Sequence, residues 1–283
     1  MTDSNTPAPG PWDAKPDQPA APAPRAPSPV NPRAAQAPDK GQHPAWAALS
    51  TLLLGGLIWY FTGSWIAVVA VLFGLLVHEY GHVLAMNAYG MGPARIYVVP
   101  FVGGMAKAQR RAESEWHGVL VSLAGPAFGL LAAIPFFGLY IVTGDPTWLE
   151  GVFYVSMLNL LNLAPAPPLD GSKALGPVLA LIHPMVEKVA MVLVGVVVVI
   201  WGISNGSYIF AGLLAFSLYG HLQRGHWRPE GRPLTRPEAA RSVGLFVLTA
   251  AACIGVALAG LMPIAGSLDQ AVAVTGSYFE FGR

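Results

Sequence analysis

Charged residues are scarce in this chain of 283 residues, since Asp, Glu, Lys and Arg together make up 11% of it, against about 25% in ordinary soluble domains. A water-soluble globular protein is therefore not expected. The 16 basic and 15 acidic residues leave a net charge of +1, so the chain lacks the basic surface with which proteins bind nucleic acid. A single cysteine, Cys253, excludes a disulfide framework and a cysteine-based zinc cluster, because each needs several thiols.

Branched aliphatic residues are almost absent from residues 1–43, which consist largely of Pro and Ala with scattered charges. A segment of this composition cannot bury enough apolar surface to offset the entropy of ordering. We therefore predict a disordered tail. Binding of a partner to its polyproline stretches is the functional alternative.

The sequence contains long runs without charged residues. No Asp, Glu, Lys or Arg occurs between Lys40 and Glu79, and this run is too long for one membrane crossing of about 20 residues. It must therefore fold back, with Gly63 and Ser64 as the natural turn. We predict an all-α polytopic membrane protein with about seven transmembrane helices, six being the alternative count. The predicted spans cover residues 45–62, 65–89, 116–144, 148–164, two stretches within 189–223, and 242–263.

The basic residues indicate an orientation for these spans. With the N-terminus in the cytoplasm, every basic residue except Arg283 falls on the cytoplasmic side, where basic residues are retained during insertion. We therefore predict a multi-pass protein of the cell membrane whose N-terminus faces the cytoplasm. Its predicted parts are the tail (1–43), a membrane core (44–223), a basic cytoplasmic loop (224–241) and a last transmembrane helix with a short tail (242–283).

The second predicted span contains three ionisable groups, His78, Glu79 and His82. A charged carboxylate in such a helix costs about 2.5 to 3.5 kcal/mol, so something must compensate. Residues four apart lie on one face of a helix, so the two imidazoles project toward a common point. This spacing is typical of a zinc site in which two histidines hold the metal and the glutamate handles the proton of a bound water. Buried polar groups that hydrogen-bond to neighbouring helices are the alternative interpretation.

A catalytic zinc normally takes three protein ligands, so a third ligand must lie elsewhere. Asp170 is the candidate, because it stands in an apolar context just after Pro165, Pro167 and Pro168. The prolines stiffen the loop and Gly171 permits a tight turn, so the carboxylate is presented from a fixed backbone. The alternative is that Asp170 only caps a helix that begins at Gly171.

Together these residues resemble the site-2 protease family of intramembrane zinc metalloproteases. The stretch from His78 to His82 matches the first motif of that family, and the pattern Asn-x-x-Pro-x-Pro-x-Leu-Asp-Gly runs from Asn162 to Gly171. The resemblance implies one zinc ion in a catalytic site. The roles that it implies are zinc ligation by His78, His82 and Asp170, general base and acid catalysis by Glu79, and contact with substrate or oxyanion by Asn162.

A third element, Ala124-Gly125-Pro126, also matches the family, but Gly129 stands where an asparagine often follows. This departure weakens a polar packing role at that position without touching the catalytic residues. Gly81, between the two histidines, leaves room for another helix or a substrate backbone to come close.

A stretch rich in β-forming residues lies between the two main motifs, and its Gly103-Gly104 pair suits a turn. The resemblance implies a re-entrant β element over about residues 93–107, near the active site. Its edge, with Gly103 and Gly104, would pair with an unwound substrate and hold it extended, because a peptide bond in a helix is shielded from water. An ordinary hairpin at the cytoplasmic surface is the alternative.

We therefore predict a zinc-dependent intramembrane endopeptidase that cleaves transmembrane segments of membrane-anchored substrates by zinc-activated water, with its active site toward the cytoplasm. The expected partners are a membrane-protein substrate with a transmembrane helix, the lipid bilayer, no nucleic acid, and a regulatory membrane partner that the sequence does not identify. Two alternatives stay open. A membrane zinc transporter needs a series of polar ligands along a path, and a non-catalytic zinc-binding membrane protein would close its site with four protein ligands.

Overall fold

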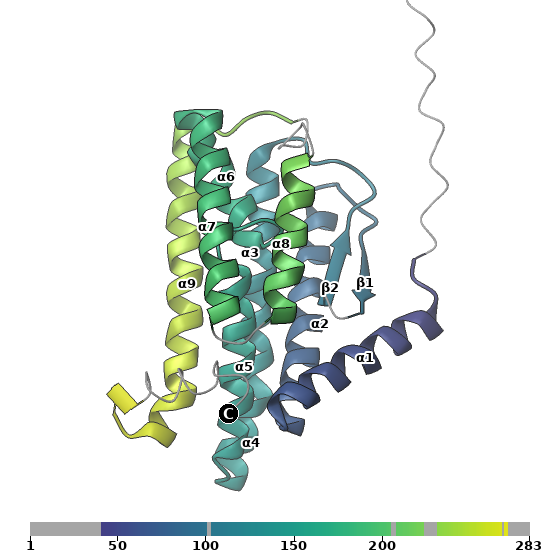
Figure 1. Cartoon of the computed structure of the whole chain (residues 1–283), viewed down its shortest axis with the longest axis vertical. Helices are drawn as coiled ribbons and strands as arrows, with labels where there is room; N and C mark the ends of the chain where they lie inside the picture. The colour runs from purple at the N-terminus through teal and green to yellow at the C-terminus, as the bar shows by residue number, and fades with distance from the viewer. Residues whose placement is uncertain (1–40, 101–102, 205–207, 224–230, 268, 271–283) are drawn as a thin grey trace, which may run out of the picture. The chain divides into compact units, whose positions relative to one another are not determined.

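The structure is a computed structural model that describes residues 41–100, 103–204, 208–223, 231–267 and 269–270. Over these residues the chain is mostly helical with a small two-stranded sheet (Figure 1), which confirms that part of the predicted fold class. The first 40 residues of the predicted tail, and residues 224–230 of the predicted basic loop, lie outside the described part. The elements are α1 (Pro44–Thr62), α2 (Trp65–Ala88), β1 (Arg95–Val99), β2 (Gly103–Lys107), α3 (Glu115–Gly129), η1 (Leu130–Ala132), α4 (Ala133–Thr143), α5 (Thr147–Asn162), α6 (Asp170–Ile182), α7 (Pro184–Ser204), α8 (Tyr208–Gln223) and α9 (Arg236–Ala265).

Among the described residues, five helical segments are long and apolar enough to cross a membrane. The third of them runs without a break through α3, η1 and α4, from Glu115 to Thr143. Helices α5 and α8 have 16 residues each, which is short of the about 20 that a span needs. The seven predicted spans are therefore not all found. The five candidates are Pro44–Thr62, Trp65–Ala88, Glu115–Thr143, Pro184–Ser204 and Arg236–Ala265.

The helix boundaries follow local signals in the sequence. Gly63 adopts a left-handed conformation with φ of 63° and ends α1, and the side chain of Ser64 caps α2 by accepting from the N–H of Ala67 at 3.2 Å. The predicted turn at Gly63 and Ser64 is thus confirmed. Thr235 and Glu238 form a reciprocal capping box at the start of α9. This helix therefore begins at Arg236, inside the stretch that the sequence had assigned to the basic loop.

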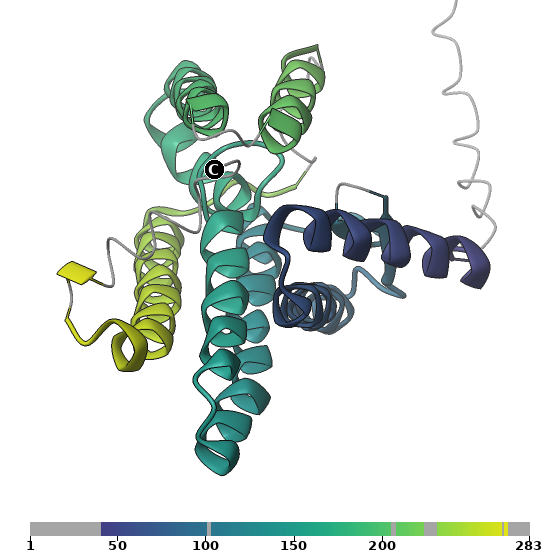
Figure 2. The same cartoon turned by 60° about the horizontal axis from the view of Figure 1, so that its bottom comes forward.

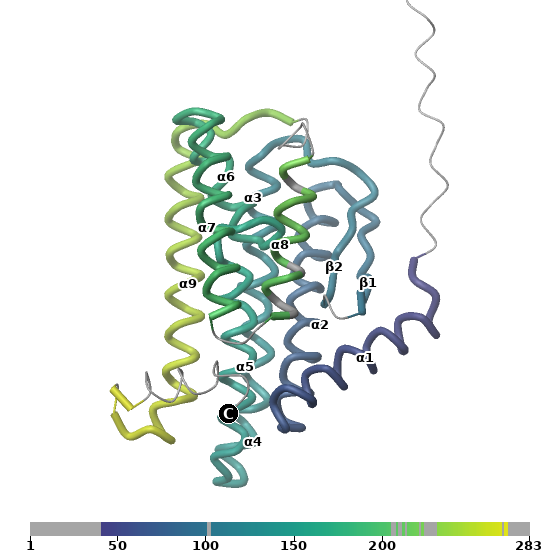
Figure 3. The backbone as a smooth tube through the Cα atoms, in the orientation of Figure 1, coloured from purple at the N-terminus to yellow at the C-terminus, as the bar shows by residue number. Residues whose placement is uncertain are grey.

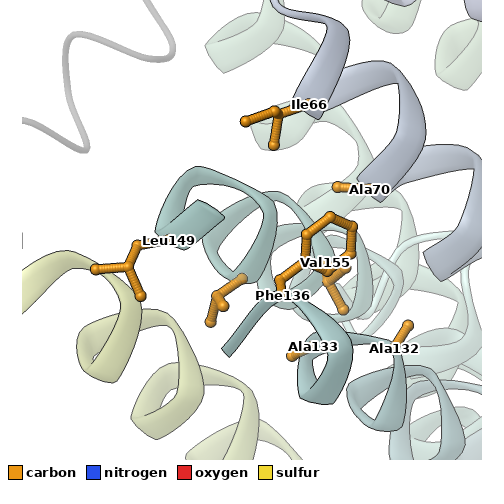
Figure 4. Packing of buried hydrophobic residues seen from close by; sticks show 8 residues of the cluster. Ile66, Ala70, Ala132, Ala133, Phe136, Leu149 and Val155 are labelled. Carbon is orange, nitrogen blue, oxygen red and sulfur yellow. The ribbon is translucent and has the colours of Figure 1, made fainter. Parts of the chain in front are cut away.

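Helix α2 lies at the centre of the packing, in contact with α1, α3, α5 and both strands. Helix α9 packs on α3, α5 and α6, while α7 packs between α6 and α8 (Figures 1 and 2). The main apolar cluster joins α2 to α4 and α5, and alanines at the contacts let the helices approach closely (Figure 4). Its buried members are Ile66, Ala70, Ala132, Ala133, Phe136, Leu149, Val152 and Val155.

The two strands form an antiparallel hairpin beside α2, as the chain trace shows (Figure 3). The predicted turn at Gly103-Gly104 is wrong, because both glycines lie in β2, where Gly103 pairs with Val99 and Gly104 with Val98. At Gly104 the lack of a side chain serves a close approach instead. A Cβ atom at Gly104 would lie 2.5 Å from Cγ of Glu79 on α2, so only glycine lets the strand lie so near this helix.

The outer edge of β1 is occupied by a side chain from the segment before α1. Gln42 Nε2 donates to the carbonyl oxygen of Val98 at 2.7 Å, and the N–H of Val98 donates to Gln42 Oε1 at 2.7 Å. Both backbone groups of Val98 therefore point away from β2, which makes Val98 and Gly104 a non-hydrogen-bonded pair. In such a pair the backbone groups of both residues point outward, so those of Gly104 point away from β1.

We expect Gln42→Leu to expose the β1 edge at Val98. A hydrogen bond of this kind contributes about 0.5 to 1.5 kcal/mol, so amide exchange at Val98 should become roughly 3- to 10-fold faster. Hydrogen–deuterium exchange of the purified protein in detergent measures this. Tyr97 pairs with Met105 inside the ladder, so its amide serves as the internal control. An unchanged rate at Val98 would show that the Gln42 amide does not protect the strand.

Candidate metal centre

Three side chains from two helices converge at one buried point. His78 and His82 lie one turn apart on α2, and Asp170 is the first residue of α6. The two Nε2 atoms are 3.1 Å apart, and each is 3.1 Å from Asp170 Oδ2. His78, His82 and Asp170 are only 2%, 6% and 4% exposed. The structure therefore brings the three predicted ligands together, although they are separated by up to 92 positions in the sequence.

The far side of each imidazole is held by an acceptor. His82 Nδ1 lies 2.7 Å from the backbone oxygen of Val121, which can only accept, so this nitrogen carries the hydrogen. His78 Nδ1 lies 2.9 Å from Asn159 Oδ1. In the neutral rings both Nε2 atoms then carry lone pairs, and these face each other and a carboxylate oxygen. Such a group of acceptors at 3.1 Å is repulsive unless a cation lies among them, so the donor set fits a divalent metal ion such as zinc.

Asp170 is held at both of its oxygens. Oδ2 faces the two histidines, while Oδ1 accepts from Lys173 Nζ at 3.2 Å. Burial raises the pKa of Asp170, and the nearby Lys173 ammonium lowers it. Leu169 is the N-cap of α6, and no side chain caps this helix. The alternative in which Asp170 serves as a helix cap is therefore wrong.

Glu79 lies between the histidine pair and the hairpin. It follows His78 directly on α2 and is 5% exposed. Its carboxylate accepts a hydrogen bond from the backbone N–H of Ala106 on β2, and its side chain packs against Gly104. The hairpin thus fixes the position of this carboxylate, and the predicted nearness of the β element to the site is found.

Two glycines allow α3 to pack against the centre. A Cβ atom at Gly81 would lie 2.5 Å from the backbone oxygen of Ala124, so Gly81 lets a neighbouring helix come close, as predicted. A Cβ atom at Gly125 would overlap the imidazole of His82 and lie 2.9 Å from His78 Nε2. The Ala124-Gly125-Pro126 element is thus the wall of the centre on the side of α3.

Asn162 lies apart from this cluster in its contacts. It is the last residue of α5, half-buried, and its Nδ2 donates to the backbone oxygen of Leu158 at 3.0 Å. Its contact with substrate or oxyanion stays a prediction. Sequence reasoning missed Asn159 and Lys173, which hold His78 and Asp170. The available signal was an amide in an apolar segment, three positions before Asn162, and a lysine one helical turn after Asp170.

Comparison with known proteins agrees with this geometry. Residues 66–157 match the sequence profile of Peptidase family M50, a stretch that holds His78, Glu79 and His82 but ends before Asn159 and Asp170. A curated protein of Synechocystis sp. (strain ATCC 27184 / PCC 6803 / Kazusa), named "Putative zinc metalloprotease sll0528", is 32% identical over 131 residues. That alignment covers 44% of this chain and 33% of the relative, so the chain spans about a third of the relative's length.

We expect Gly125→Ala to abolish tight metal binding, because the new methyl group would displace the imidazole of His82. The loss in zinc affinity should exceed the roughly 10- to 100-fold that removal of an outer hydrogen-bond partner costs. Competition with a chelator of known affinity, on the purified protein in detergent, measures it.

Gly118→Ala is the matched control on the same helix, since a Cβ atom there meets nothing within 4 Å. This variant should bind zinc like the unaltered protein. Equal zinc affinities of the two variants would contradict the placement of α3 against the ligands.

Proposed function

We propose that the chain is a member of peptidase family M50, whose profile residues 66–157 match, and that it is a zinc-dependent intramembrane endopeptidase. It cleaves peptide bonds in the transmembrane segments of membrane-anchored proteins. The observation that carries the proposal is the convergence of His78, His82 and Asp170 on one point, with Glu79 beside it on the same turn of α2. Two imidazoles and one carboxylate are three ligands, which leave a position for water and substrate on a catalytic zinc.

The proposed chemistry divides between one metal ion and the chain's own residues. A bound zinc ion supplies a Lewis acid that activates water and polarises the scissile carbonyl. Glu79 takes the proton of the attacking water and passes it to the leaving amine. The N–H of Ala106 on one side and Gly104 on the other keep its carboxylate in place. Asn162, at the end of α5, is the candidate for contact with the oxyanion.

We place the substrate along the outer edge of β2. The backbone groups of Gly104 point away from β1, and Ala106, two residues further on, has its N–H directed to Glu79. An extended peptide that pairs with Gly103 and Gly104 would therefore run beside the general base. The β1 edge is a poorer place at Val98, because Gln42 holds both backbone groups there. Strand addition gives affinity through main-chain hydrogen bonds and keeps the peptide out of a helix.

The membrane setting of the proposal combines structure and sequence. Five candidate spans support a multi-pass protein, and we propose that α5 and α8 complete seven crossings. The distribution of basic residues supports a cytoplasmic N-terminus and an active site that opens toward the same side. The proposed substrate is a membrane protein with a transmembrane helix.

The transporter alternative receives no support from the described residues. A transport path needs several polar sites in series. In the part of the chain that the structure describes, His78, His82 and Asp170 form the one group of three or more metal-binding side chains. One three-ligand centre with an adjacent carboxylate suits hydrolysis better than passage of ions.

We expect Glu79→Gln to retain zinc and to lose peptide cleavage by at least about 10²-fold, since general base catalysis contributes about 10² to 10⁴. Zinc content is measured by mass spectrometry of the purified protein. Candidate substrates are single-span membrane proteins that accumulate in the membranes of cells carrying the variant. Their cleavage is measured with the purified protein in proteoliposomes.

Tyr80→Phe is the matched control, because Tyr80 is the next residue on α2 and is 52% exposed. It should cleave like the unaltered protein. Full cleavage by Glu79→Gln, or zinc flux through proteoliposomes without any cleavage, would exclude the proposed function.

A further inference from the structure

A buried amide on α5 touches the metal centre from outside the matched family segment. Asn159 is fully buried, and its Oδ1 lies 2.9 Å from His78 Nδ1. Its Nδ2 donates to the backbone oxygen of Val155 at 2.8 Å. Because a backbone oxygen can only accept, the amide nitrogen must face Val155 and the amide oxygen must face His78. The orientation of the amide is therefore determined by the helix that carries it.

This orientation determines which nitrogen of His78 is available to a metal. With Oδ1 as acceptor, Nδ1 of His78 carries the hydrogen and Nε2 presents its lone pair to Asp170 Oδ2, 3.1 Å away. The backbone oxygen of Val121 accepts in the same way from Nδ1 of His82, and no substitution removes a backbone oxygen. The partner of His78 is a side chain, that of Asn159, so mutation can test its role.

Gly129 at the end of α3 makes room for this amide. A Cβ atom at Gly129 would overlap Asn159 Oδ1 and lie 2.7 Å from both Cγ and Nδ2. The backbone of Gly129 is ordinary helix with φ of −55°, so glycine is required there for space and not for conformation. This explains why glycine stands at position 129, where an asparagine often follows the Ala-Gly-Pro element. An amide does lie at this place, but it is that of Asn159 on α5.

We propose that Asn159 is a positioning residue of the metal centre, which fixes the ring and tautomer of His78, and that Gly129 is its obligatory partner on α3. The proposal rests on the metal site of the proposed function but not on peptide hydrolysis. Outer partners of this kind raise the basicity of the ligand and are worth about 10- to 100-fold in metal affinity.

Two substitutions at Asn159 separate positioning from packing. Asn159→Leu keeps the branched shape of the side chain and removes the acceptor, so zinc affinity should fall about 10- to 100-fold. Asn159→Asp keeps an acceptor oxygen toward His78, so zinc affinity should stay within about 3-fold of the unaltered protein. A purely structural role predicts the reverse order, because a buried carboxylate disturbs packing more than a leucine does.

The measurements are zinc affinity by chelator competition and the visible absorption spectrum of the cobalt-substituted protein, both in detergent. Ser156→Ala is the matched control, since Ser156 is equally buried on α5 but donates to the backbone oxygen of Val152. It should leave both readouts unchanged. Equal affinities for Asn159→Leu and the unaltered protein, or a loss in Asn159→Asp as large as in Asn159→Leu, would overturn the proposal.

The role of Gly129 is tested by a double-mutant cycle. Gly129→Ala and Asn159→Ala should each weaken zinc binding as Asn159→Leu does, but Gly129→Ala should cost no more than about 2-fold when Asn159 is already alanine, because the two residues act through one contact. Additive losses would show that Gly129 acts elsewhere. If these affinities follow the prediction while no peptide is cleaved, positioning stands and the proposed protease activity fails.

Discussion

Three acceptors confined to one buried point are the constraint on which the rest of the structure depends. Two imidazole nitrogens and a carboxylate oxygen, each 3.1 Å from the other two, repel one another when nothing positive lies between them. A cation reverses the sign of this interaction and draws α2 and α6 together. Metal binding and the packing of these helices are therefore linked, since the free energy of one contributes to the other. The outer partners come from α3 and α5, so four helices meet at this point.

Small residues make that meeting possible. Gly125 and Gly129 on α3 face His82 and Asn159, and Gly104 on β2 faces Glu79. In each pair the polar group occupies the space that a side chain would have taken. Because lipid offers little hydrophobic drive for helix association, close approach through small residues is a main source of packing energy in membrane proteins. The same glycines therefore allow the helices to pack closely and leave space for the polar side chains of the metal centre.

The sequence predicts the centre better than its surroundings, and the reasons are physical. His78 and His82 lie four positions apart, so helix geometry alone places them together, and the proline-rich approach singles out Asp170 among the carboxylates. The role of Asn159 was not predicted from the sequence, because its position next to His78 depends on how α5 packs on α2. No local pattern encodes that packing. Gly103 and Gly104 were assigned to a turn because glycine signals both turns and close approaches. The span count differed because α5 and α8 are apolar but have only 16 residues each.

The unequal edges of the hairpin have a consequence for turnover under the proposed docking. Two strands alone are marginal, and Gln42 already fills the β1 edge at Val98, so a bound chain would become the third strand beside β2. Hydrolysis would divide that strand into two shorter pieces, each with fewer backbone hydrogen bonds to the sheet. The hairpin would then bind an intact chain more tightly than either fragment. Cleavage would therefore itself weaken binding, so that the products dissociate before the next turnover.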